Sequence, residues 1–70
     1  MSNDDIDGLI ETDLTSNPNS TAQEIIDSVG TVSKTKMRHW IAKKAFDDGT
    51  ITSVETNNPL DWDVNTYTNP

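Results

Sequence analysis

All of the positive charge in this chain lies in one short segment. Residues 34–44 hold every lysine and arginine, together with the only histidine, and no acid interrupts them: Lys34, Lys36, Arg38, His39, Lys43 and Lys44. Cations gathered on one stretch of chain can contact successive phosphates of a nucleic-acid backbone, and such clustering marks a nucleic-acid interface better than total charge does. A solvated helix face is the plainer interpretation, but it does not explain why every cation lies there.

The rest of the chain is acidic. Seven acids precede residues 34–44 and five follow them, and the 70 residues carry a net charge of −7. As a total, this charge argues against a nucleic-acid partner, because phosphate repels an acidic surface. Along the chain it divides into a segment of +5 and a body of −12. The segment is suited to DNA, and the body is suited to a basic protein.

Length and composition exclude several classes of protein. Seventy residues without cysteine allow one small domain held by hydrophobic burial, with no disulfide, thiolate zinc site or thiol nucleophile. No apolar run approaches the ~18–20 residues of a membrane span, so we expect a cytoplasmic protein, complete as given, with no membrane partner. One histidine and scattered aspartates predict no metal site, no catalytic residue and no cofactor, and hence no enzyme.

Three helices are expected to position the basic segment. The first covers about residues 4–14, where apolar residues recur at helical spacing. The second begins at Ser20 or Thr21, each of which offers a capping box, and ends at a glycine. The third covers about residues 34–47 and is capped by Ser33. Its apolar stripe is formed by Met37, Ile41 and Ala45, with Trp40 at the border and Phe46 on the outward face.

Two strands are expected to follow the helices. Residues 50–55 and 60–67 alternate in polarity on either side of a turn that contains Pro59, which predicts a β-hairpin. In the second strand Leu60, Trp62 and Val64 would share one face. The tail, residues 68–70, is expected to be disordered.

This order of elements resembles that of a family. Residues 20–51, STAQEIIDSVGTVSKTKMRHWIAKKAFDDGTI, resemble the winged helix-turn-helix domains in their capped helix ending in Gly, their Ser-capped basic helix and their Asp-Gly-x-Ile exit. The resemblance implies an α+β fold in which three helices precede a two-stranded hairpin wing, as one domain over residues 1–67. Two features depart from the family. The apolar stripe of the third helix steps by four and four rather than four and three, and the wing carries no Lys or Arg.

The resemblance also implies a DNA-binding protein, a transcriptional regulator whose third helix enters the major groove of duplex DNA. The expected DNA-contacting residues are Ser33, Lys34, Thr35, Lys36, Arg38, His39, Lys43 and, in the wing turn, Asn57 and Asn58. Five cations limit the salt dependence of a monomer to a slope of about −4.5. Tight binding would therefore require a homodimer or a protein partner.

A second hypothesis stays open. The acidic body suits a protein-interaction module that binds a basic surface: an antirepressor, an inhibitor of a nucleic-acid enzyme or a DNA mimic, such as a viral accessory protein. Phe46 bears on self-association, since it either packs beneath the chain termini or marks a contact between copies. The two tryptophans are expected in the core, where a domain this small needs their buried area.

Overall fold

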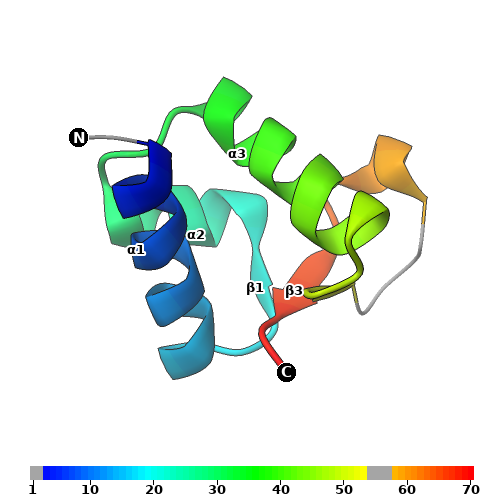
Figure 1. The fold of residues 1–70 in the computed structure, drawn as a ribbon, viewed down its shortest axis with the longest axis horizontal. Helices are drawn as coiled ribbons and strands as arrows, with labels where there is room; N and C mark the ends of the chain where they lie inside the picture. The colour runs from blue at the N-terminus through cyan, green and yellow to red at the C-terminus, as the bar shows by residue number, and fades with distance from the viewer. Residues whose placement is uncertain (1–2, 54–57) are drawn as a thin grey trace.

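The computed structural model describes residues 3–53 and 58–70, and Figure 1 shows their arrangement. Within this part of the chain, three α-helices and a three-stranded antiparallel sheet form a small α+β fold. The elements in chain order are α1 (Asn3–Ser16), β1 (Ser20–Thr21), α2 (Ala22–Val29), α3 (Lys34–Ile41), a π-helical segment η1 (Ala42–Asp47), β2 (Thr52–Ser53), a 3₁₀ turn η2 (Pro59–Asp61) and β3 (Thr66–Thr68). The expected α+β class is thus present, but the strands differ from the expected hairpin.

Local capping signals set the bounds of α2 and α3. Thr21 is the N-cap of α2, and its hydroxyl accepts from the Glu24 amide while the Glu24 carboxylate accepts from the Thr21 amide. Gly30 ends α2 in the left-handed region at φ 80°, a conformation that costs glycine least. The Ser33 hydroxyl accepts from the Lys36 amide and starts α3. These caps confirm the expected starts of both helices.

The core lies where the three helices meet the sheet. Its buried apolar members come from the three α-helices, from β3 and from two connecting segments: Ile10, Leu14, Ala22, Ile25, Val32, Met37, Trp40, Ile41, Ile51 and Tyr67. Each large apolar side chain buried in this way contributes about 1.5–3 kcal/mol relative to exposure. Because α3 supplies Met37, Trp40 and Ile41, one face of this helix is held against the core and the opposite face is left to solvent.

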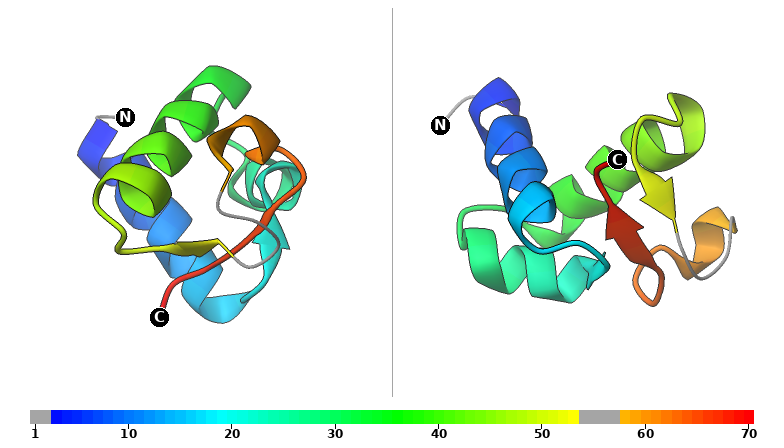
Figure 2. Two further views of the ribbon diagram at one scale, coloured as in Figure 1. Left: turned by 90° about the vertical axis from the view of Figure 1, so that its right-hand side faces the viewer. Right: turned by 90° about the horizontal axis from the view of Figure 1, so that it is seen from below.

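The sheet differs from the expected two-stranded wing. β1, which was not expected, pairs antiparallel with β3, with Ser20 opposite Tyr67. β2 pairs with the other edge of β3, with Ser53 opposite Tyr67, and the two strands run side by side in Figure 2. The order is therefore β1-β3-β2, and the last strand lies in the middle of the sheet rather than at its edge.

The expected strand over residues 60–67 is wrong for most of its length. Pro59 opens η2, and the Asn58 side chain accepts from the Leu60 amide, which favours a turn over an extended chain. Leu60 and Val64 are 82% and 63% exposed, so they do not share a buried face with Trp62, which packs against the core. Alternating polarity in this segment therefore did not indicate a strand.

The carboxyl-terminal residues belong to the fold. Thr68 lies in β3 and pairs with Thr52. The Asn69 side-chain nitrogen donates to the Thr15 hydroxyl at 3.0 Å. The expected domain boundary at residue 67, with a disordered tail after it, therefore lies too early.

The end of the third helix explains the unusual spacing of its apolar residues. The helix continues from α3 into η1, where the Asp48 amide donates to the Lys43 carbonyl at 2.7 Å, five residues back. A π turn holds more residues than an α turn, so the side chains after residue 42 leave α-helical phase. Ala45 and Phe46 both become half-buried and pack against the core. Phe46 is therefore a packing residue, and it does not lie on an outward face.

Candidate functional site

The solvent face of the third helix carries a continuous stripe of exposed residues. It follows two ridges of the helix, one spaced 34, 38, 42 and the other 35, 39, 43, and it holds three cations, one histidine and no acid: Lys34, Thr35, Arg38, His39, Ala42 and Lys43. We call these six residues the α3 stripe. Five of them were expected to contact DNA, and the structure brings those five together on one surface.

The core and the N-cap orient the α3 stripe. Met37, Trp40 and Ile41 are 0%, 2% and 0% exposed, so α3 cannot rotate about its axis without unpacking them. The Ser33 hydroxyl accepts from the Lys36 amide at 3.1 Å, which leaves other amides of the first turn directed away from the helix. Such amides favour an anion at the helix start. The helix that carries the stripe is thus held in one orientation, with its cations facing solvent.

Lys36 does not belong to this stripe. Its ammonium lies 2.9 Å from the Asp7 Oδ1 on α1, and the two side chains are only 23% and 27% exposed. Lys36 was expected to contact DNA, but its ammonium is engaged by Asp7. Lys36 precedes the buried Met37 and lies four residues before the buried Trp40, and it is held at the α1 side of α3 by its counterion.

Lys43 has a much looser partner. Its ammonium lies 3.4 Å from the Asp48 Oδ1, and the two side chains are 66% and 36% exposed. An exposed pair of this kind is worth about 0.2–1 kcal/mol and is screened by salt. Lys43 can therefore turn to another anion at small cost, whereas Lys36 must give up a partner that is mostly buried.

The two asparagines expected in the wing turn are only partly placed. Asn57 lies outside the described residues. Asn58 is exposed, and its side-chain oxygen accepts from the Leu60 amide at 3.1 Å. This bond commits one acceptor of Asn58 to the turn between β2 and β3.

A crevice lies between the basic helix and α1, beside the α3 stripe. It has a volume of about 340 Å³ and is lined by Asp7, Lys36, His39, Trp40, Lys43 and Lys44. Three of these residues were not among the expected site residues: Asp7, Trp40 and Lys44. Trp40 is almost fully buried, and its indole N–H has no hydrogen-bond acceptor among the described residues. Only the position of Lys44 in the basic segment could have indicated this crevice from the sequence.

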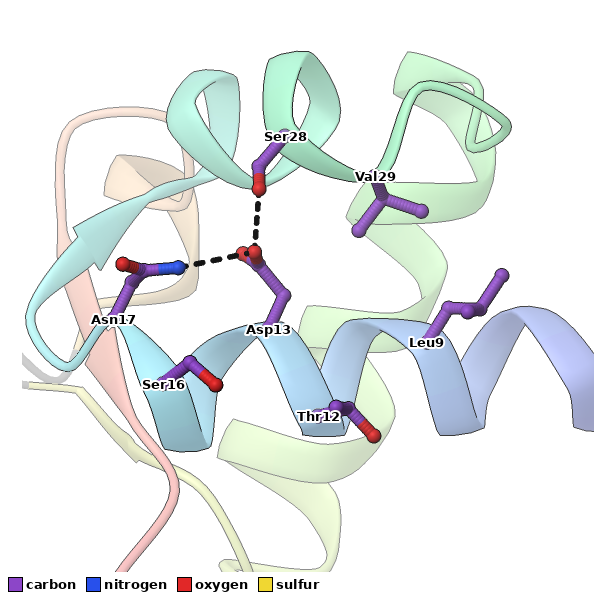
Figure 3. Close-up of a pocket in the computed structure, with 7 residues that line it drawn as sticks. All are labelled: Leu9, Thr12, Asp13, Ser16, Asn17, Ser28 and Val29. Atoms are coloured by element: carbon purple, nitrogen blue, oxygen red, sulfur yellow. Dashed lines mark hydrogen bonds between the residues drawn. The ribbon is translucent and has the colours of Figure 1, made fainter.

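A second hollow, of opposite charge, lies between α1 and α2 (Figure 3). Its volume is about 390 Å³, and it is lined by Leu9, Thr12, Asp13, Ser16, Asn17, Ser28 and Val29. The Asp13 carboxylate points between the helices and accepts from Ser28 Oγ at 2.5 Å and from Asn17 Nδ2 at 3.2 Å. Leu9 is 40% exposed at the apolar end of this groove.

Among the described residues, Tyr67 has a strongly shifted pKa. This residue is part of the core. Burial raises its pKa to about 12 from an ordinary value of 10.0, with a further increase from the charge of Asp63 that the hydrogen bond from Asn65 opposes. The phenol donates to the Trp62 carbonyl at 2.7 Å. The neutral phenol is the form that this buried site favours.

Comparisons with protein-family models, with curated proteins and with solved structures find no match to this chain. Among the described residues, no group of three or more His, Cys, Asp or Glu side chains is placed to hold a metal ion. No helix in the same part of the chain is long and apolar enough to cross a membrane. The features of this chain that bear on function are its two charged surfaces.

Proposed function

We propose that this chain is a winged helix-turn-helix protein that binds duplex DNA through the α3 stripe and regulates transcription. The element order α1-β1-α2-α3-β2-β3 supports this assignment, with the short β1 joined to β3 in a β1-β3-β2 sheet. In a helix-turn-helix domain the second helix of the motif presents its outer residues to base edges in the major groove. Here α2 and α3 form the motif, with Gly30 and Ser33 at its turn.

The observation that carries the proposal is the exposure of the whole α3 stripe. All six of its side chains are exposed and none is an acid, in a protein whose acids outnumber its cations by twelve to five. The major groove is about 12 Å wide and admits an α-helix. Ala42, between Arg38 and Lys43 on the stripe, is small enough to permit close approach. Acids farther from this face than a Debye length of about 8 Å are largely screened at physiological salt.

The charge available for DNA is modest. Of the five cations, Lys36 is held by Asp7, which leaves four for phosphate contacts. Each neutralised phosphate contributes about 0.9 to the slope of log affinity against log salt, so a monomer reaches a slope of about −3.6 at most. We propose that tight operator binding uses a homodimer or a protein partner.

The test is a titration with duplex DNA that is followed by backbone amide NMR. Shifts should concentrate on residues 33–44, and Arg38→Gln with Lys43→Gln should remove them. The matched control is the double variant Asp7→Asn with Lys36→Gln, which removes one charge of each sign, keeps the net charge at −7, and leaves the α3 stripe intact. The control should bind as the wild type does, and equal losses in both variants would contradict a role for the stripe.

The groove of Figure 3 favours a second candidate function, the binding of a basic protein by the acidic body. The groove places the Asp13 carboxylate beside the apolar Leu9 and Val29, and residues 1–33 hold seven acids and no cation. A partner segment with a cation next to an apolar side chain would match both features. A lysine- and leucine-containing peptide should then shift the amides that line the groove. Asp13→Asn should weaken that binding, and Asp27→Asn, the same charge change outside the groove lining, should not.

A further inference from the structure

The crevice beside the α3 stripe has the composition of an anion site. Of the described residues that line it, three carry ammonium groups, Lys36, Lys43 and Lys44, and one carries a carboxylate, Asp7. That carboxylate is already compensated, because its Oδ1 lies 2.9 Å from the Lys36 ammonium. The remaining charge in the crevice is therefore positive, and His39 adds a ring nitrogen to the wall.

Trp40 supplies an independent sign that a ligand is accommodated there. The residue is 2% exposed, it lines the crevice, and its indole N–H lacks an acceptor within the described chain. Buried donors are paired in the great majority of protein structures. Indole is a donor only, and the Trp40 nitrogen has less than 1 Å² of accessible surface, so an acceptor oxygen in the crevice pairs with it only after the neighbouring side chains shift.

We infer that this crevice binds a phosphate group, held by the ammonium groups of Lys43 and Lys44 and by the indole N–H of Trp40. A phosphate oxygen accepts from several donors at once, and charge-assisted bonds of this kind are the stronger ones. Lys36 stays on Asp7 and neutralises the carboxylate of the crevice lining, while Lys43 leaves its exposed partner Asp48 for the phosphate. The crevice differs from the α3 stripe in that its cations surround a hollow, whereas those of the stripe lie on an open helix face.

The inference deepens the proposed function and rests on it for the source of the phosphate. His39 and Lys43 belong both to the crevice and to the α3 stripe, so a duplex lying on the stripe brings its backbone to the mouth of the crevice. The phosphate is then one of the DNA backbone, and its contact would set the position of the helix in the groove, since phosphate contacts fix register and orientation. A free phosphate-containing ligand has the same chemistry and is the other source.

The indole resonance of Trp40 reports on this site directly. The chain has two tryptophans, and Trp62→Phe assigns the two indole N–H signals. Pyrophosphate and a duplex oligonucleotide are titrated separately at constant ionic strength, with sodium chloride as the blank. The Trp40 indole signal should move to saturation with the duplex. Lys44→Gln, inside the crevice but off the stripe, should abolish the movement. Lys34→Gln, outside the crevice, should lower the duplex affinity through the stripe and still leave the indole movement at duplex saturation.

The outcomes separate the two proposals. If the α3 amides shift with the duplex while the Trp40 indole responds to neither probe, the phosphate site is wrong and DNA binding by the stripe stands. If the indole responds to pyrophosphate but not to a bound duplex, the site is upheld with a free phosphate ligand as its source. A response to pyrophosphate with no α3 shift on adding duplex would overturn the proposed function and retain the site. No response anywhere overturns both.

Discussion

Replacing Asp7 by asparagine should strengthen DNA binding, because Asp7 withholds a cation from it. The Asp7 carboxylate lies 2.9 Å from the Lys36 ammonium, and both side chains are about three-quarters buried. Asparagine keeps the shape of the side chain and removes its charge. The Lys36 ammonium, on a flexible four-carbon stem, can then extend toward the backbone of a duplex that lies on the neighbouring stripe.

The size of the gain follows from counterion release. One more neutralised phosphate steepens the salt slope by about 0.9, from about −3.6 to about −4.5. The affinity should then rise by up to about 15-fold at 50 mM salt and about fourfold at 200 mM. The fold itself should lose about 1 kcal/mol, the upper end of the range for ion pairs near a surface, and its Tm should fall by about 4–8 °C.

The assay is fluorescence anisotropy of a labelled duplex at several salt concentrations. Asp27→Asn is the matched control, because it makes the same change in net charge on α2, where Asp27 accepts from Gln23 and has no described cation partner. Asp27→Asn should leave the slope near that of the wild type. If Asp7→Asn and Asp27→Asn give the same slope, Lys36 is not the cation that Asp7 withholds, and the reasoning fails.

Ser33→Ala should lower the free energy of unfolding by about 1 kcal/mol, because it removes the N-cap of α3. Ser33→Asp should keep the cap but weaken DNA binding, because it places a carboxylate at the stripe. Equal stability of the Ser33→Ala variant and the wild type in urea would contradict the role of Ser33 as the cap. Tyr67 is the only tyrosine, so tyrosinate absorbance should titrate near pH 12 in the folded protein and near 10 in denaturant. Because the folded state favours the neutral phenol, the free energy of unfolding should fall by about 2 kcal/mol as the pH rises from about 10 to 12. The Tyr67→Phe variant should lack this fall. Equal titration midpoints in the folded and the denatured protein would contradict the prediction. Gly8→Ala should stabilise the fold, since Gly8 lies inside α1 with open space where a Cβ would stand, whereas Gly30→Ala should destabilise it, since φ there is +80°. Each change in the free energy of unfolding should be about 0.5–1 kcal/mol and is measured by urea unfolding; changes of the same sign would contradict these placements of the two glycines.

Helix ends could be predicted from this sequence because their signals are local. The capping box of Thr21, the glycine at position 30 and the cap at Ser33 each depend on residues within four positions of one another. The strands could not be predicted in the same way. β1 has two residues, and its partner Tyr67 lies 47 positions from Ser20. Over residues 60–64 the polarity alternates as in a strand, but the chain turns after Pro59, which no alternation reveals.

The solvent-exposed residues of the candidate site could be predicted from the sequence. An amphipathic helix exposes the face opposite its apolar stripe, which is enough to place Thr35, His39 and Lys43 in solvent. The pairing of Lys36 with Asp7, which removes Lys36 from the stripe, could not be predicted, because packing of α1 against the rest of the fold brings the two side chains together. The crevice was missed for the same reason, since it forms only where Asp7 meets Trp40 and Lys44.

DNA binding by the third helix is best tested by an amide NMR titration of the full chain with a duplex at low salt. Binding through the third helix predicts shifts concentrated on residues 33–44, a loss of those shifts in the Arg38→Gln, Lys43→Gln variant, and their persistence in the Asp7→Asn, Lys36→Gln control. Absence of shifts in residues 33–44 at low salt, with the fold intact, would contradict the claim.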